Sequence, residues 1–350
     1  MIALDAMGGD HAPNVTVRGA IAAAKRGIDV GLFGDKEILQ AELFKADPAW
    51  QKLSLSIIPC LQTIGMDEEP SRMVMRKRDS SLVRAVQAVA DGQATAVVSA
   101  GNSGAALVAG TLILGRTEGV ERPALGMMLP VRSGHLFCAD LGGTTDCKPE
   151  YLEQFALMGH VYMKQRLGIA HPRIALLSNG HEPYKGSSAV KKTYELLEKR
   201  SDITFIGNLE ARDIFQGNTD VLVCDGFTGN VMLKTVQGTM REMFTRIKQE
   251  INRSLFYKLI FFFGQGIFNR LKTDYNYRDQ GHAPMLGLRH LLLVAHGCSS
   301  ELAIESALIA ADTMVREKFL ATYNSELTAR INAHTNPSQQ SGSDSLAHTL

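Results

Sequence analysis

The chain has 350 residues, of which 45% are hydrophobic and 21% are charged, so it can bury a sizeable globular core. Its 37 basic and 36 acidic residues give a net charge of +1, which argues against a protein dedicated to nucleic acid. Five scattered cysteines without a CxxC pair indicate a reducing compartment and exclude a disulfide scaffold or a structural zinc site. Because there is neither a leader-like start nor a run of about 18 apolar residues, we expect a cytoplasmic protein without a membrane span.

A short apolar strand, a glycine-rich loop and then a helix is the dominant pattern along the chain. It first occurs at Ile2–Asp5, which is followed by a loop and by a predicted helix over about 14–26. Further strands of this kind are predicted over 29–33, 94–99, 135–140, 174–178 and 220–224. This alternation predicts an α/β fold with a doubly wound, mostly parallel, Rossmann-like sheet, in which ligands bind beyond the carboxyl ends of the strands.

The first loop expected at that edge contains a glycine pair followed by an acid and an imidazole. It reads Gly8-Gly9-Asp10-His11. His11 could act as a general base or could bind an anion when protonated. The alternative is a histidine that is merely held by the neighbouring Asp10.

A second loop, Gly101-Asn102-Ser103-Gly104, joins a predicted strand to a predicted helix. Glycines allow a close approach of backbone to ligand, and the free N–H groups of a helix start attract anions. The alternative is an ordinary turn with Ser103 as the helix cap. The loop does not match GxGxxG, and no GxxxxGK[ST] motif occurs, so neither NAD nor ATP binding is indicated.

A third loop spans 225–230 and contains Asp225, Thr228, Gly229 and Asn230, with a helix expected from about 231. Two glycine-rich helix starts that face one cleft would form a phosphate site. The alternative is again capping and turn geometry.

On a fourth loop, Lys185 could stabilise charge on a carbonyl or phosphate oxygen, although a single lysine is usually a solvated surface residue.

A basic cluster follows the acidic stretch 67–69. Its members are Arg72, Arg76, Lys77, Arg78 and Arg84. It is either a solvated helix face or a docking patch for an acidic partner.

Cys147 and Cys224 could carry an acyl group covalently, but a small buried hydrophobe is the simpler role, and direct attack on the substrate is preferred.

The segment 253–272 is rich in aromatic and aliphatic residues, and its four charges are all positive. Gly264 and Gly266 are expected to interrupt it, which predicts a hairpin within 245–280 rather than one helix. A membrane-contacting hairpin on anionic headgroups is favoured over a dimer interface or an interior helix pair. The expected membrane contacts are Leu255, Phe256, Leu259, Ile260, Phe263 and Ile267. The hairpin is expected to be an insertion in one domain over 1–335, followed by a disordered polar tail over 336–350.

Taken together and in order, these segments resemble the bacterial phosphate acyltransferases of the PlsX type over about residues 1–325. The motifs that carry the resemblance lie at 5–13, 66–70, 77–81, 99–104, 146–150, 154–159, 205–208, 225–230 and 283–287. Ser103 stands where threonine is common, His282 where glycine is usual, and Cys298 within a His-Gly-Ser-Ser-like stretch. The sequence Leu-Gly-Gly-Thr-Thr-Asp over 141–146 lacks an asparagine that the family usually has.

The resemblance implies that inorganic phosphate attacks the thioester of an acyl carrier protein and yields acyl phosphate for phospholipid synthesis. It also implies a fold similar to phosphate acetyltransferases and isopropylmalate dehydrogenases, a homodimer, peripheral membrane contact, and no metal or other cofactor. Catalytic roles are carried onto Asp10, His11, Lys185 and Asn230. Substrate-binding roles are carried onto Gly8, Gly9, Gly101, Asn102, Ser103, Gly104, Asp225, Thr228 and Gly229. The basic cluster becomes the candidate dock for the acidic carrier protein.

Two other functions stay open. A phosphate acetyl- or butyryltransferase that uses coenzyme A thioesters would share the chemistry and the fold. A divergent relative could instead keep the carrier-protein dock and the membrane hairpin as a scaffold without catalysis, which the changed loop at 143–145 would favour.

Overall fold

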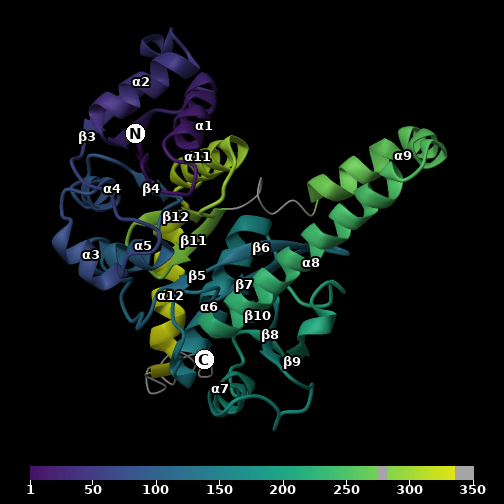
Figure 1. Cartoon of the computed structure of the whole chain (residues 1–350). Coiled ribbons are helices and arrows are strands. Elements are labelled where there is room, and N and C mark those ends of the chain that lie inside the picture. Colours follow the sequence, from purple (N-terminus) through teal and green to yellow (C-terminus); the bar gives the residue numbers. More distant parts are fainter. Residues whose placement is uncertain (275–281, 336–350) are drawn as a thin grey trace, which may run out of the picture.

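The computed structural model describes residues 1–274 and 282–335 (Figure 1). Its strands form a seven-stranded sheet in the order β3-β2-β1-β4-β12-β11-β5 and a five-stranded sheet in the order β6-β7-β10-β8-β9. All neighbouring strands are parallel except β11 beside β12 and β5, and β6 beside β7. The predicted α/β class with mostly parallel pairing is confirmed, and the strands are divided between two sheets.

The seven-stranded sheet comprises β1 (Ile2–Asp5), β2 (Val30–Gly34), β3 (Leu55–Pro59), β4 (Ala96–Ser99), β5 (Ala124–Leu125), β11 (His282–Leu286) and β12 (Leu291–Ala295). The five-stranded sheet comprises β6 (Met127–Val131), β7 (Gly134–Ala139), β8 (Arg173–Ser178), β9 (Thr204–Glu210) and β10 (Val221–Val223). The predicted strands correspond to β1, β2, β4, β7, β8 and β10. The sequence pattern missed β3, β5, β6, β9, β11 and β12.

Successive residues of a strand point to opposite faces of its sheet. Each face contributes to one of two hydrophobic cores, and each core extends over both sheets. Leu4 and Leu176 belong to one buried cluster, and their neighbours Ala3 and Leu177 belong to the other. The first cluster is covered by α1 (Asn14–Lys25), α2 (Lys36–Ala46), α6 (Pro149–Leu167), α7 (Ser188–Glu198), α11 (Glu301–Arg316) and α12 (Phe319–Thr335). The second is covered by α3 (Pro70–Arg76), α4 (Ser81–Ala90), α5 (Ser103–Ala109) and the start of α8 (Gly226–Asn252). Because each cluster contains residues of both sheets, the cores hold the sheets together.

His160 in α6 makes the stability of this core depend on pH. The residue is buried, and neither ring nitrogen has a hydrogen-bond partner among the described residues. Burial lowers the pKa of its imidazole from 6.5 to about 4. As the pH falls below 6.5, His160 therefore binds a proton in the unfolded chain but not in the native state. The native state loses stability as a result.

We expect the wild type to lose about 2 kcal/mol of unfolding free energy between pH 7 and pH 5 relative to His160→Leu. Urea titrations of both proteins at the two pH values measure this difference. An equal loss in both proteins would mean that His160 is protonated in the native state.

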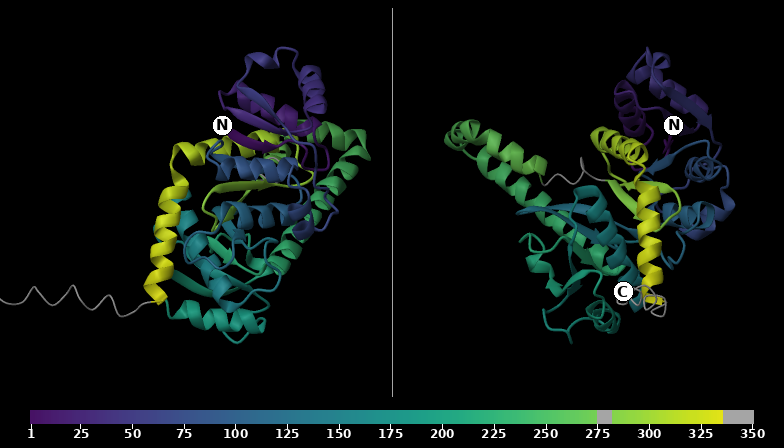
Figure 2. Two further views of the ribbon diagram at one scale, coloured as in Figure 1. Left: turned by 90° about the vertical axis from the view of Figure 1, so that its left-hand side faces the viewer. Right: turned by 180° about the vertical axis from the view of Figure 1, so that it is seen from behind.

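Helices α8 and α9 (Leu255–Asp274) form a hairpin that projects from the body of the molecule (Figures 1 and 2). Phe268 holds the two helices together, since its ring lies 5.5 Å from Phe244 and 5.2 Å from Phe261 between centroids. The predicted interruption at Gly264 and Gly266 is wrong, because α9 runs through both glycines. A glycine costs an exposed helix about 1 kcal/mol but does not end it.

Three of the six expected membrane contacts are strongly exposed on this hairpin. Phe256, Leu259 and Phe263 are 65%, 60% and 82% exposed, and Tyr257 and Phe262 are exposed beside them. The side chains of Leu255, Ile260 and Ile267 lie outside the described residues, as do the end of the expected hairpin after residue 274 and the tail 336–350. None of the helices in the described part of the chain is long and apolar enough to cross a membrane.

Candidate functional site

The loops that follow β1, β4 and β12 form the first of two clusters of predicted site residues. Ser99 donates a 2.7 Å hydrogen bond to the buried carboxylate of Asp5, whose pKa burial raises. A Cβ atom added to Gly8 would lie only 2.4 Å from Asp5 Oδ2 and 2.9 Å from the nitrogen of Gly101. Glycine is therefore required at position 8 for the loops after β1 and β4 to approach each other.

The acid and the imidazole of this first cluster lie at its solvent edge. The backbone nitrogen of Asp10 donates to the carbonyl of Gly297 at 2.8 Å, which ties the loop after β1 to the loop after β12. Gly9 makes this turn with a φ of +113°. The side chains of Asp10 and His11 are exposed, and neither makes a hydrogen bond or ion pair with another described residue. Both are free to meet a ligand.

Asn102 is committed to protein contacts. Its side-chain oxygen caps α5 by accepting from the nitrogen of Ala105 at 3.0 Å, so the alternative interpretation of Ser103 as the cap is wrong. Its amide donates to three carbonyls of the 65–68 loop at 3.0–3.3 Å. These bonds to a distant loop explain why Asn102 rather than Ser103 caps α5. Ser103 is exposed, and Gly104 packs against Pro70, where a Cβ would lie 2.7 Å from Cγ.

The second cluster surrounds the start of α8, which begins at Gly226 and thus earlier than predicted. Asp225 caps it by accepting from the nitrogen of Thr228 at 2.8 Å and from its hydroxyl at 2.7 Å. Asn230 donates its amide to the carbonyl of Leu141 at 3.0 Å and so fastens α8 to the loop after β7. The contacts of Asp225 and Thr228 therefore match the alternative interpretation, in which this loop caps a helix.

Asp140, which was not among the predicted site residues, organises this second cluster. It is fully buried and accepts backbone N–H groups from Leu125 at 2.9 Å, Gly143 at 3.0 Å and Thr144 at 2.5 Å. Burial raises the pKa of its carboxyl, and the backbone donors oppose that shift. The only local signal was an acid that ends a predicted strand before a glycine pair, which is common at any turn.

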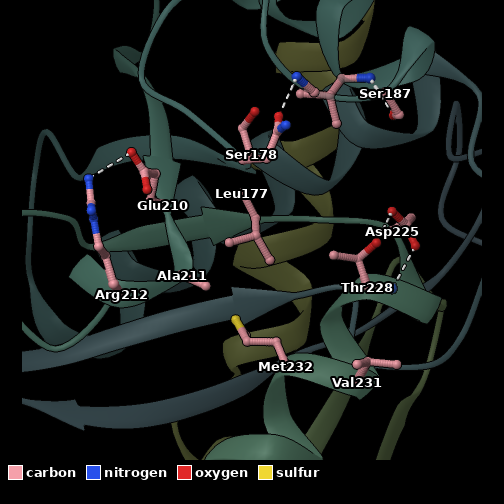
Figure 3. Close-up of a pocket in the computed structure, with 13 residues that line it drawn as sticks. Leu177, Ser178, Ser187, Glu210, Ala211, Arg212, Asp225, Thr228, Val231 and Met232 are labelled. Atoms are coloured by element: carbon pink, nitrogen blue, oxygen red, sulfur yellow. Dashed lines mark hydrogen bonds and ion pairs between the residues drawn. The ribbon is translucent and has the colours of Figure 1, made fainter.

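A cavity of about 610 Å³ opens beside the cap of α8 (Figure 3). Leu177 and Met232 lie between the Glu210–Arg212 pair on one side and the Asp225–Thr228 pair on the other. The remaining lining residues are Ser178, Asn179, Gly186, Ser187, Val190, Ala211 and Val231. Most of these residues were not predicted, because they come from the ends of β8 and β9, from the segments that follow them, and from α7 and α8, which meet only in the fold.

Lys185 directly precedes the Gly186 that lines this cavity. Its ammonium lies 5.7 Å from the centroid of the Tyr184 ring and forms no ion pair within the described part of the chain. A second cavity of about 700 Å³, lined in part by Lys148 and Phe227, shares three residues with the first: Ser187, Asp225 and Thr228. Asp225 and Thr228 therefore stand where the two cavities meet. The first loop cluster belongs to strands of the other sheet.

Known proteins resemble this chain over nearly its whole length. The family model of fatty acid synthesis proteins matches residues 1–322. A phosphate acyltransferase of Pelotomaculum thermopropionicum is 41% identical over 327 residues, which are 93% of this chain and 94% of the relative. One from Brevibacillus brevis is 43% identical over 323 residues, covering 90% and 94%. The chain belongs to the phosphate acyltransferase family. It is an acyltransferase.

Solved structures show the fold of this acyltransferase in other proteins. A phosphotransacetylase from Streptococcus pyogenes has a TM-score of 0.57 at 17% identity and covers 90% of this chain and 94% of its own. A branched-chain phosphotransacylase from Enterococcus faecalis has a TM-score of 0.50 at 17% identity and covers 90% of this chain and all of its own. At these identities the likeness concerns the fold alone.

Two of the five cations of the basic cluster are paired with acids in the acyltransferase. Lys77 contacts Glu68 at 2.6 Å, and Arg84 contacts Asp79 at 2.7 Å. The other three arginines, at 72, 76 and 78, are exposed and form no ion pair among the described residues. The free positive charge is thus concentrated on α3 and the turn that follows it.

The cysteines near the second cluster are poor nucleophiles. Burial raises the pKa of the Cys147 thiol to about 12 and that of Cys224 well above its ordinary value. Because the thiolate is the reactive form, both residues are unreactive near neutral pH. This favours direct attack on the substrate over a covalent intermediate on either residue.

Proposed function

We propose that this acyltransferase transfers a fatty acyl group from an acyl carrier protein thioester to inorganic phosphate, which yields an acyl phosphate for phospholipid synthesis. The observation that carries the proposal is the family membership over residues 1–322. The cavity beside Lys185 and the α8 cap supports it, because it offers polar groups and an apolar wall together.

The chemistry needs placement more than activation, because phosphate is already an oxyanion. A phosphate oxygen attacks the thioester carbonyl carbon, the C–S bond breaks, and the leaving thiolate takes up a proton. In the proposal, Lys185 and the second amide N–H of Asn230 stabilise the negative charge that develops on the carbonyl oxygen. Asp10, His11 and the backbone at the start of α5 orient phosphate; the N–H groups of a first helical turn lack intrahelical partners.

Removal of the Lys185 ammonium tests this assignment. We expect Lys185→Ala to lower kcat by about 100-fold or more, as the loss of one preorganised oxyanion donor does elsewhere. The assay follows phosphate-dependent loss of a hexadecanoyl carrier-protein thioester and traps the acyl phosphate with hydroxylamine. The matched control is Lys191→Ala on the exposed side of α7, which should leave kcat unchanged. A wild type that forms no acyl phosphate would refute the function, whereas an active Lys185→Ala would refute only the role of this residue.

A phosphate acyltransferase that uses short coenzyme A thioesters is the second candidate. The fold shared with the Streptococcus pyogenes phosphotransacetylase favours it. The three unpaired arginines support the carrier protein instead, since an acidic partner would bind there. The same assay with both donors decides between them: transfer from the carrier protein should slow as salt increases, and transfer from a coenzyme A thioester should not.

We further propose that the hairpin contacts an anionic membrane surface. Its exposed aromatic residues would each gain about 1.5–3 kcal/mol on burial, and Lys258 lies among them. Phe263→Asp should therefore weaken binding to phosphatidylglycerol-containing vesicles about tenfold or more in flotation. Phe44→Asp on α2, a residue that is 63% exposed, is the control and should bind like the wild type. Equal flotation of Phe263→Asp and the wild type would exclude this contact.

The remaining proposals concern organisation. Residues 1–335 are proposed to form one catalytic unit with the hairpin as an insertion, and two copies are proposed to form a homodimer. Sedimentation equilibrium of the full chain distinguishes a dimer from a monomer.

A further inference from the structure

The cavity beside the α8 cap has a polar rim and an apolar floor. The rim beside the α8 cap carries Ser187, Asp225 and Thr228. The floor consists of Leu177, Val190 and Met232, all of them nearly buried. Leu177 and Met232 also belong to the core cluster beneath the sheet, so this floor is a rigid apolar surface.

The far side of the cavity carries an arginine that is already paired with acids. Arg212 donates to Glu210 at 3.0 Å and lies 3.8 Å from Asp213. His181 is within 3.4 Å of Asp213 and 3.6 Å of Glu210. Arg212 thus contacts two carboxylates, so a second anionic group of a ligand would find no unpaired guanidinium there. An uncharged chain fits this end better than a polar one.

The volume of the cavity is large enough for a long acyl chain. A methylene group takes up about as much space as a water molecule in the liquid, roughly 30 Å³, so an acetyl group needs roughly 60 Å³ and a chain of about 16 carbons roughly 480 Å³. The cavity holds about 610 Å³. An acetyl group would leave most of the apolar floor in water, whereas a long chain would cover it and gain about 0.8 kcal/mol for each buried methylene.

We infer that this cavity binds the hydrocarbon chain of the acyl donor, which enters past Ser187 and Thr228 and lies over Leu177 and Met232 towards Ala211. Ala211 and Val231 line the cavity from exposed positions, so they set the length of chain that fits. The inference rests on the proposed acyl transfer and adds to it a location for the chain and two residues that control chain length.

The test shortens the cavity from its exposed end. We expect Ala211→Trp to lower kcat/KM at least tenfold with a hexadecanoyl donor and to leave a butyryl donor within about twofold, so that the preferred chain becomes shorter. Val231→Trp is the second variant, from the opposite wall. The matched control is Ala41→Trp at an exposed position on α2, which should keep the chain-length profile of the wild type. Circular dichroism confirms that each variant is folded.

A binding measurement separates failure of the inference from failure of the proposed function. Fluorescence of cis-parinaric acid reports a bound hydrocarbon chain without any transfer. If the wild type transfers acyl groups but neither tryptophan variant changes the chain-length profile, the inference is wrong and the function stands. If no donor is turned over but the probe binds the wild type and is lost from both tryptophan variants, the function is wrong and the cavity assignment stands. Probe binding that both variants retain also overturns the assignment.

Discussion

Gly229→Ala is expected to destabilise the acyltransferase by about 3 kcal/mol and to abolish its activity, because the new methyl group has no room. The added Cβ would lie 2.0 Å from the carbonyl oxygen of Asp140 and 2.7 Å from the sulfur of Cys224. One of these neighbours is backbone and the other is a fully buried side chain, so neither can swing aside. The start of α8 would have to move away from β7, and the α8 cap at Asp225 would move with it.

The same substitution further along the helix is the control. At Gly238 an added Cβ meets nothing within 4 Å, so Gly238→Ala should stabilise the protein by about 0.5–1 kcal/mol through helix propensity. Urea unfolding of both variants and the wild type gives the comparison. Similar effects of the two substitutions would show that α8 does not lie against the 139–141 backbone as described.

The second large effect is expected at Asp140. Asp140→Ala leaves the backbone N–H groups of Leu125, Gly143 and Thr144 without acceptors. An unsatisfied buried donor costs about 1–3 kcal/mol, so we expect a loss of about 3–5 kcal/mol in unfolding free energy. The loop over 141–144 also carries the carbonyl that holds Asn230, and its displacement should lower kcat about 100-fold.

Asp140→Asn and Asp146→Asn complete that experiment. The first keeps the size of the side chain but turns a donor towards a backbone N–H group, so it should lower stability and kcat in the same direction as alanine. Asp146 lies exposed in the same stretch of chain, and its substitution should leave both quantities unchanged. If Asp140→Asn behaved like Asp146→Asn, the carboxylate would not be needed to order the loop.

Local patterns were sufficient for six of the strands and for the cap at Asp225, but not for the central strand β12 or for the cap of α5. A short apolar run before a glycine-rich loop located β1, β4, β8 and β10, because strands buried on both faces are continuously apolar. The same patterns missed β9, where small and polar residues interrupt the apolar run. They also placed a break at Gly264 and Gly266, where propensity alone was too weak to end a helix that packs through Phe268.

For the candidate site, too, some features could be predicted from the sequence and others could not. The sequence by itself determined the α/β class, the glycine-rich strand ends and, through its resemblance, the family, because these depend on the order of residues along the chain. Only the tertiary structure decided that the strands form two sheets, that Asn102 rather than Ser103 caps α5, and that Asp140 orders the second loop cluster. It also decided that Leu177, Ala211 and Met232 line one cavity. Each of these depends on contacts between segments far apart in the sequence, and such contacts form only when hydrophobic burial brings those segments together.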